Sequence, residues 1–210
     1  MKKAWVCPVL YKEKETQKKY KEIWDSRSSF LTDAIESNSY VHDKEVFSYV
    51  YGIVSQIANA NRDRVPVAPF ILLDRSSSVN AYALGNNILA LNLGLITFSQ
   101  SREELALVLA HEMSHNILAH PENAMKQRAE LLTSEEYKNS LNAVLDSKYE
   151  RLTRLKKILA NYSFSRSKHQ RYHESDADSL AIILLKKAEI SFTATYFCGW
   201  IVPTYNTGSH

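Results

Sequence analysis

Apolar residues recur with the spacing of α-helices over much of the chain. The pattern predicts two early helices, over residues 9–37 and 42–60. In the second of these, one face carries Val46, Tyr49, Val50, Ile53 and Ile57. Later apolar repeats predict further helices over 122–132, 134–160 and 168–188, with a break at the polar segment 161–167.

Short apolar runs in the first half of the chain predict strands instead of helices. They cover residues 68–73, 79–84 and 88–91, and Gly85-Asn86-Asn87 forms a turn between the last two. The order is therefore helices, a small sheet, then helices. This order is typical of an α+β fold dominated by helices.

One predicted helix is apolar on every side, and such a helix is normally buried in its domain. It follows Ser101 and Glu104, which have the spacing of a capping box, and Pro121 is expected to end it. Polar groups in such a helix cost free energy unless they have partners. The three polar residues near its middle, His111, Glu112 and His115, therefore indicate a site.

His111 and His115 are four residues apart, so they lie one helical turn apart on the same side of the axis. With Glu112 they complete the pattern H-E-x-x-H, in which the histidines bind zinc and the glutamate acts as general base. The alternative is a chance match between core histidines that hydrogen bonds satisfy. The position of the pattern in a central apolar helix makes this alternative less favoured.

A catalytic zinc ion usually has three protein ligands and one open position for water. The extended pattern H-E-x-x-H-x-x-G-x-x-H would supply a third histidine, but Leu118 replaces its glycine and Pro121 replaces its last histidine. His120 is one residue too early and is interpreted as a polar residue at the helix end.

The second common source of a third ligand is a carboxylate on a later helix. Glu174 and Asp178 are four residues apart, and like charges at this spacing repel unless a positive charge is near. Zinc bound by Glu174 would supply this charge, with Asp178 accepting a hydrogen bond from a ligand histidine. The alternative is a pair of surface carboxylates balanced by Arg171. Asp176 points elsewhere and is a poorer candidate.

Composition excludes several classes of function. The chain has 210 residues, of which 26 are Lys or Arg and 23 Asp or Glu, and this formal charge of +3 is too small to indicate nucleic acid. Its five glycines form no phosphate-binding loop, and Cys7 and Cys198 form no cysteine-based zinc site. We expect no membrane span and find no apolar run that suits a signal peptide, so the compartment stays open.

These motifs together resemble the HtpX-like zinc endopeptidases, which are gluzincins related to the CAAX prenyl proteases. The resemblance covers residues 45–188. It rests on His-Glu-Met-Ser-His and on the later motif Glu-x-x-Ala-Asp. It also rests on two segments that precede His-Glu-Met-Ser-His, namely Ser-Val-Asn-Ala-Tyr-Ala-Leu and Gly-Leu-Ile-Thr-Phe. It implies one zinc ion held by His111, His115 and Glu174.

The resemblance further implies that Glu112 is the catalytic base and that Asp178 supports a ligand histidine. Arg171 matches an arginine often found before the glutamate, and Asn80 and Ala81 match the strand that borders the substrate cleft. Integral-membrane members carry transmembrane helices that we do not expect here, so a prenylated substrate is not implied. The candidates for stabilising the oxyanion are His169, Tyr172, His173 and Tyr205.

The sequence thus predicts a zinc metalloendopeptidase that acts on peptides or unfolded proteins, with oligomeric state open. A peptide could bind as an added strand along 79–84 or 88–91. We expect an N-terminal helical segment (1–40), a zinc metallopeptidase domain (41–190) and a C-terminal tail (191–210). The main alternative is a latent, zinc-stabilised peptide-binding or chaperone-like module whose cleft is blocked by 1–40 or 122–160. A metal-free helical interaction protein is the second alternative.

Overall fold

The computed structural model describes residues 6–36, 40–146 and 150–191, without the side chains at 34, 35, 151, 159 and 161–170. Its helices are α1 (Lys14–Glu36), α2 (Lys44–Ala60), α3 (Leu93–Phe98), α4 (Arg102–Ile117), α5 (His120–Thr133), α6 (Glu135–Leu145) and α7 (Arg151–Lys187). The strands are β1 (Phe70–Asp74), β2 (Ala81–Gly85) and β3 (Ile88–Asn92). The predicted α+β fold dominated by helices is confirmed.

The three strands form one mixed sheet in the order β1-β3-β2. β3 lies in the centre, parallel to β1 and antiparallel to β2. Asn86 and Asn87 join β2 to β3 with φ angles of 50° and 58°, which suits the tight turn that a two-residue hairpin requires. β2 therefore forms one edge of the sheet, and the run at 88–91 lies in its centre.

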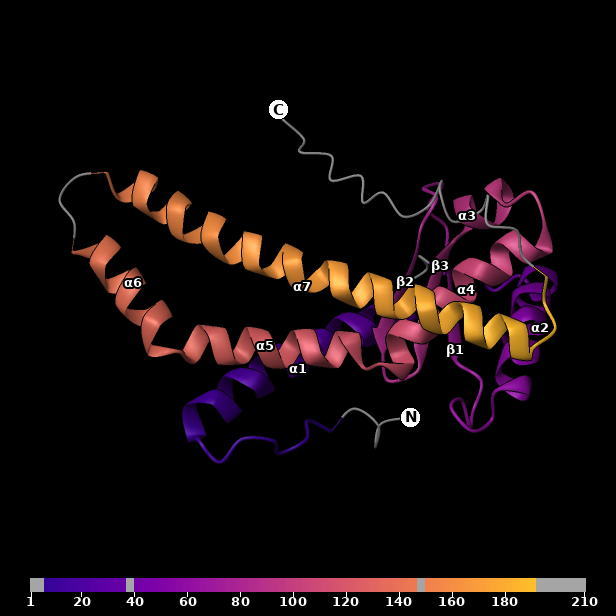
Figure 1. Ribbon diagram of the computed structural model, residues 1–210, viewed down its shortest axis with the longest axis horizontal. Helices are drawn as coiled ribbons and strands as arrows, with labels where there is room; N and C mark the ends of the chain where they lie inside the picture. The colour runs from indigo at the N-terminus through magenta and orange to yellow at the C-terminus, as the bar shows by residue number, and fades with distance from the viewer. Residues whose placement is uncertain (1–5, 37–39, 147–149, 192–210) are drawn as a thin grey trace.

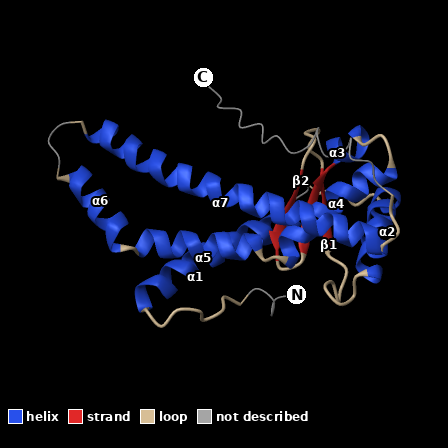
Figure 2. Ribbon diagram, viewed as in Figure 1, coloured by secondary structure: helices blue, strands red, loops and turns tan. Residues whose placement is uncertain are grey.

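The main core lies between this sheet and three helices, α2, α4 and the C-terminal half of α7 (Figure 2). α4 packs chiefly on α7 and on β2. Its buried side chains include Leu105, Ala106, Leu107, Leu109, Ala110 and Met113. Burial on several sides explains why the apolar residues of this helix do not form a single stripe.

A helical arm extends from this core and consists of α5, α6 and the N-terminal half of α7 (Figure 1). α1 lies along α5. The contact between them buries Tyr20 and Trp24 of α1 against Met125 and Ala129 of α5. The N-terminal segment is thereby attached to the base of the arm.

Two predictions about the later helices are wrong. The break at 161–167 is absent, because α7 continues through this segment. The segment contains serines and asparagine but neither proline nor glycine, and such residues cost only a few tenths of a kcal/mol each in a helix. The prediction of a single helix over 134–160 is also wrong. α6 ends at Leu145, and α7 begins only after Glu150, which has a φ of 58°.

The prediction that Pro121 ends the central helix is wrong as well. α4 already ends at Ile117, and Pro121 lies in the first turn of α5. This position suits proline, because the first helical N–H groups have no partner within the helix. The short helix α3, which follows β3 directly, was not expected.

Among the described residues, no helix combines the length and apolar character that crossing a membrane requires. The tail predicted at 191–210 lies outside the described residues except for Ser191. The predicted division into three segments stays a prediction.

Candidate metal centre

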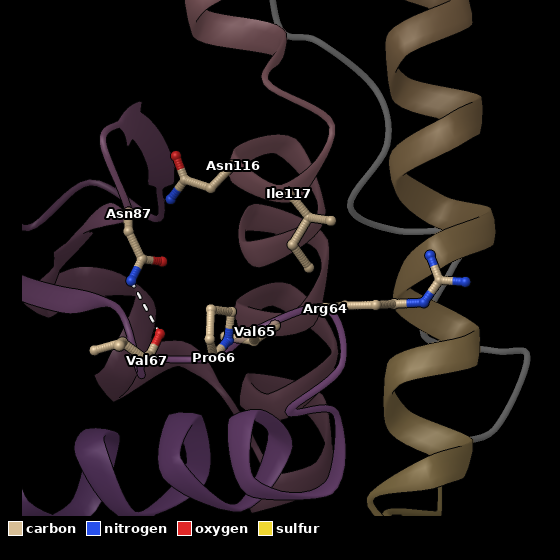
Figure 3. Close-up of a pocket in the computed structure, with 7 residues that line it drawn as sticks. All are labelled: Arg64, Val65, Pro66, Val67, Asn87, Asn116 and Ile117. Carbon is tan, nitrogen blue, oxygen red and sulfur yellow. Dashed lines mark hydrogen bonds between the residues drawn. The ribbon is translucent and has the colours of Figure 1, made fainter.

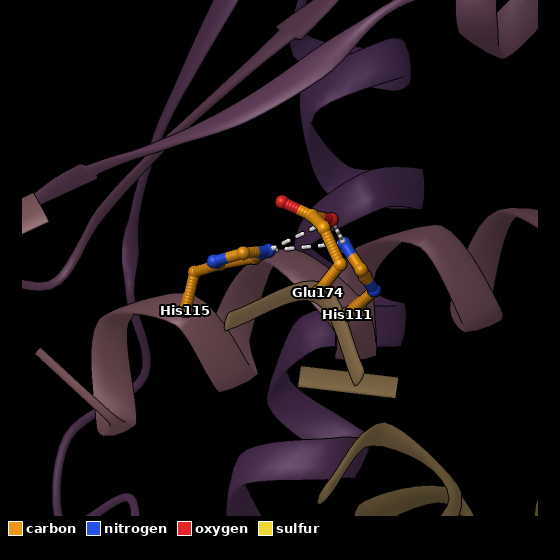
Figure 4. Close-up of side chains that lie close together, drawn as sticks. All are labelled: His111, His115 and Glu174. Carbon is orange, nitrogen blue, oxygen red and sulfur yellow. Dashed lines mark hydrogen bonds and ion pairs between the residues drawn. The ribbon is translucent and has the colours of Figure 1, made fainter. Parts of the chain in front are cut away.

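Three side chains that could bind a metal meet where α4 packs on α7 (Figure 4). His111 and His115 come from consecutive turns of α4, and Glu174 reaches them from α7. The two histidine Nε2 atoms are 3.0 Å apart. Glu174 Oε2 lies 3.3 Å from Nε2 of His111 and 3.6 Å from Nε2 of His115.

These spacings suit a zinc ion. Ligand atoms at about 2.0–2.1 Å from tetrahedral zinc lie about 3.4 Å from one another, and the three observed distances bracket this value. The donor set, two imidazoles and a carboxylate, is one that catalytic zinc sites use, with the fourth position free for water. The three residues therefore fit zinc in both spacing and chemistry.

His111 has its other ring nitrogen fixed by α7. Nδ1 lies 2.8 Å from Asp178 Oδ1, so a proton on Nδ1 donates to the carboxylate and Nε2 is turned toward Glu174. Burial lowers the pKa of His111, but hydrogen bonds to Asp178 and Glu174 outweigh this effect and raise it to about 10. The same contacts with the two histidines hold the pKa of Glu174 well below its usual range.

Glu112 lies beside these groups and is partly buried. Burial is the largest effect on its pKa and raises it, while His111, His115 and a hydrogen bond from the backbone of Ala83 in β2 lower it. The resulting pKa is about 6. A carboxyl group with a pKa near neutral pH can both accept and return a proton, as a general base must.

The edge strand β2 runs beside this group of side chains. Asn80 precedes the strand, is exposed, and its carbonyl accepts a hydrogen bond of 3.0 Å from the N–H of Asn92. Backbone groups alternate in direction along a strand, so Ala81 and Ala83 turn theirs away from β3. The guanidinium of Arg27, from α1, donates to the carbonyl of Leu84 at the far end of β2.

Asn116, a side chain that the sequence did not single out, fixes α4 to the sheet. Asn116, next to His115, accepts from the Gly85 N–H at 3.0 Å and donates to the Ile88 carbonyl at 3.0 Å. It thereby fixes α4 to both strands of the hairpin. In the sequence, the feature that could have pointed to Asn116 is its position directly after the H-E-x-x-H motif.

His120 was interpreted from the sequence as a helix-end residue, and in the structure it belongs to the site. It is only 8% exposed, and its Nδ1 lies 2.9 Å from Nδ1 of His115. Burial, and then His173 and His115, lower its pKa to about 4, so the ring is neutral at pH 7. Its ring stacks on that of His173.

The remaining candidates lie farther from the three donor atoms or are not described. Arg171, Tyr172 and Asp176 are exposed. His173 is partly buried against His120. The side chain of His169 and all of Tyr205 lie outside the described residues, so the oxyanion stabiliser stays unassigned.

Asn116 also lines a pocket of about 320 Å³ (Figure 3). Its lining residues are Arg64, Val65, Pro66, Val67, Asn87, Asn116 and Ile117. Arg64 points from it toward α7. None of the three metal-site donors lines this pocket, so it is not part of the candidate metal centre.

The helix pair and its donor set define a domain of the metallopeptidase class. The family model "Peptidase family M48" matches residues 45–198, more than half of the chain. The chain therefore belongs to peptidase family M48, whose members are metalloproteases. This match confirms the family resemblance drawn from the motifs.

Two curated relatives are each similar to more than half of the chain. One is the putative beta-barrel assembly-enhancing protease of Vibrio cholerae serotype O1, 29% identical over 134 residues, which are 63% of this chain and 27% of the relative. The other is the beta-barrel assembly-enhancing protease of Yersinia pestis, 26% identical over 151 residues, which are 70% of this chain and 31% of the relative. The matched part thus spans less than a third of each relative.

Proposed function

We propose that this chain is a zinc metalloendopeptidase in which His111, His115 and Glu174 bind one zinc ion. The observation that carries the proposal is the convergence of three donor atoms, from two helices, at the mutual spacing of zinc ligands. Membership of a metalloprotease family supports it. Zinc at this position would acidify a bound water and polarise the carbonyl of the scissile bond.

Glu112 is the proposed general base. Its carboxylate takes the proton of the attacking water and passes it to the nitrogen of the leaving peptide. The pKa of about 6 suits both transfers, because the group is ionised before attack at pH 7 and is not too weak a base to hold the proton. The hydrogen bond from Ala83 orients the carboxylate from the side of β2.

Asp178 is proposed to orient His111, since a carboxylate on the second ring nitrogen fixes both the tautomer and the direction of the ring. The 2.8 Å contact supports this role. Without zinc, the protonated imidazole of His111, which contacts both Glu174 and Asp178, supplies positive charge to the two carboxylates. With zinc bound, the metal ion would supply this charge instead.

Substrate peptides are proposed to bind along β2 as an added strand. The backbone of Ala81 faces away from β3 and provides one donor and one acceptor for such a strand, with Asn80 beside it. Recognition through backbone groups accepts many sequences, which suits a peptide or an unfolded protein. The names of the two relatives refer to β-barrel assembly.

The test compares the wild type with Glu112→Gln in two measurements on the same samples. These are zinc content by elemental analysis and cleavage of an unfolded protein such as casein. Glutamine has the shape of glutamate but cannot take the proton, so we expect near-equimolar zinc in both and at least about 100-fold slower cleavage in the variant. Glu103→Gln, in the first turn of the same helix, is the control and should cleave like the wild type.

Three results would contradict the proposal in different ways. A wild type without zinc after zinc-replete purification rejects the metal site. Equal cleavage by the wild type and Glu112→Gln rejects the base. Zinc in both samples with cleavage in neither rejects the peptidase and favours the latent peptide-binding module.

A further inference from the structure

The turn between α4 and α5 returns the chain to the metal site. α4 ends at Ile117, and Ala119 adopts a left-handed conformation with φ 53°. This conformation is uncommon for a residue with a side chain, and such residues cluster at functional sites. Its effect is to place His120, the first residue of α5, over the last turn of α4 and against His115.

His120 is held on two sides. One ring nitrogen, Nδ1, lies 2.9 Å from Nδ1 of His115. One face of the ring stacks on His173, with the ring centroids 4.2 Å apart and the planes 10° from parallel. His173 directly precedes Glu174 on α7, so His120 contacts both helices that supply the donor atoms.

The hydrogen bond between two Nδ1 atoms requires one donor and one acceptor. His115 can bind a metal through Nε2 only when this nitrogen carries no proton, and the neutral ring then has its proton on Nδ1. Nδ1 of His115 is therefore the donor in the metal-binding state, and Nδ1 of His120 is the acceptor.

From this geometry we infer that His120 is a positioning residue for His115, in the way that Asp178 is for His111. The inference rests on the proposed zinc site and deepens it. A neutral acceptor has a physical advantage here, because Glu112, Glu174 and Asp178 already bring three carboxylates to the site. A fourth at this position would add charge repulsion, whereas an imidazole fixes the tautomer without adding charge.

The test uses two substitutions that separate the hydrogen bond from the packing. His120→Phe keeps a ring that can stack on His173 but removes the acceptor. His120→Asn loses the ring but can place its side-chain oxygen near the position of Nδ1. The first measurement is zinc affinity by competition with a chelator, and the second is the thermal midpoint of the zinc-free proteins.

We expect zinc to bind about 10- to 100-fold more weakly to His120→Phe than to the wild type, as when other partners of ligand histidines are removed. His120→Asn should recover most of this loss. The thermal midpoints of the zinc-free proteins should not follow the same order, because packing favours Phe over Asn. Ring ¹⁵N–¹H spectra of the zinc-loaded proteins should show an exchange-protected Nδ1–H on His115 in the wild type and His120→Asn, and not in His120→Phe.

Unchanged zinc affinity in His120→Phe, with zinc bound normally by the wild type, would overturn the inference and leave the proposed function intact. The inference would also be overturned if the zinc affinities of the three proteins had the same order as the thermal midpoints of their zinc-free forms. His120 would then have only a packing role. A wild type that binds no zinc would overturn the proposed function and this inference together, which distinguishes the two failures.

Discussion

The two halves of α7 have opposite surroundings although they form one helix. The C-terminal half packs into the core and buries Ala177, Leu180, Ala181, Leu184 and Leu185. In the N-terminal half, Leu152 is 66% exposed, and Thr153, Arg154, Lys156 and Lys157 are exposed as well. Glu174 and Asp178 lie at the start of the packed half. The proposed zinc site thus lies where the helix is already held by the core.

This placement explains how the helix can supply donors with defined positions. A ligand set must be held by side chains and backbone that packing keeps in place. Asp178 lies between the buried residues Ala177 and Leu180, and α4, on the other side of the site, is buried along most of its length. The exposed half of α7 has no comparable support among its described side chains.

The largest expected difference between the two halves is in stability. Leu184→Ala removes a fully buried side chain and should lower the free energy of unfolding by about 2–5 kcal/mol. Leu152→Ala, the matched change in the arm, should lower it by no more than about 0.5 kcal/mol. Urea unfolding of the two variants measures both values. Equal losses would show that the arm is as tightly packed as the core.

Much of the site could be predicted because a helix fixes the relative positions of residues four apart. This rule places His111 above His115 and Glu174 one turn from Asp178 without knowledge of the fold. The position of His120 could not be predicted, because it depends on Ala119 adopting a left-handed conformation that alanine does not signal.

The course of the arm was also beyond the sequence pattern. Residues 161–167 are mostly polar and weak helix formers. They are helical because helix is already formed on both sides of them, and extending a helix costs less free energy than starting one. The short helix α3 depends on close approach: a side chain at Gly94 would meet the backbone of Ser77, so this glycine lets the loop before β2 lie against the start of α3.

The next effect concerns Asp178, at the boundary between the two halves. Asp178→Ala should leave the fold intact and weaken zinc binding by roughly 10- to 100-fold, because His111 loses the group that orients it. Ser179→Ala, the exposed neighbour, is the control and should bind zinc like the wild type. Chelator competition measures both, and unchanged affinity in Asp178→Ala would return this residue to the role of a surface carboxylate.

A smaller effect links zinc binding to pH. Without metal the pKa of His111 is about 10, so at pH 7 the ring holds a proton that zinc must displace. Affinity should therefore rise with pH, by about 10-fold per pH unit for this one proton, until pH passes this pKa. Chelator competition at pH 7 and pH 8 tests the sign. In Asp178→Ala the rise should be shallower, and an affinity that falls with pH would contradict the assignment of His111.

The central claim is that two helices supply two imidazoles and one carboxylate to a single zinc ion, and zinc K-edge X-ray absorption tests it most directly. The wild type should show four nitrogen or oxygen neighbours at about 2.0–2.1 Å, with the multiple scattering of two imidazole rings. Glu174→Ala should lose most of its zinc but retain the two-imidazole signature in what remains. A wild-type spectrum with three imidazoles would contradict the account, because it would make a further histidine the third ligand in place of Glu174.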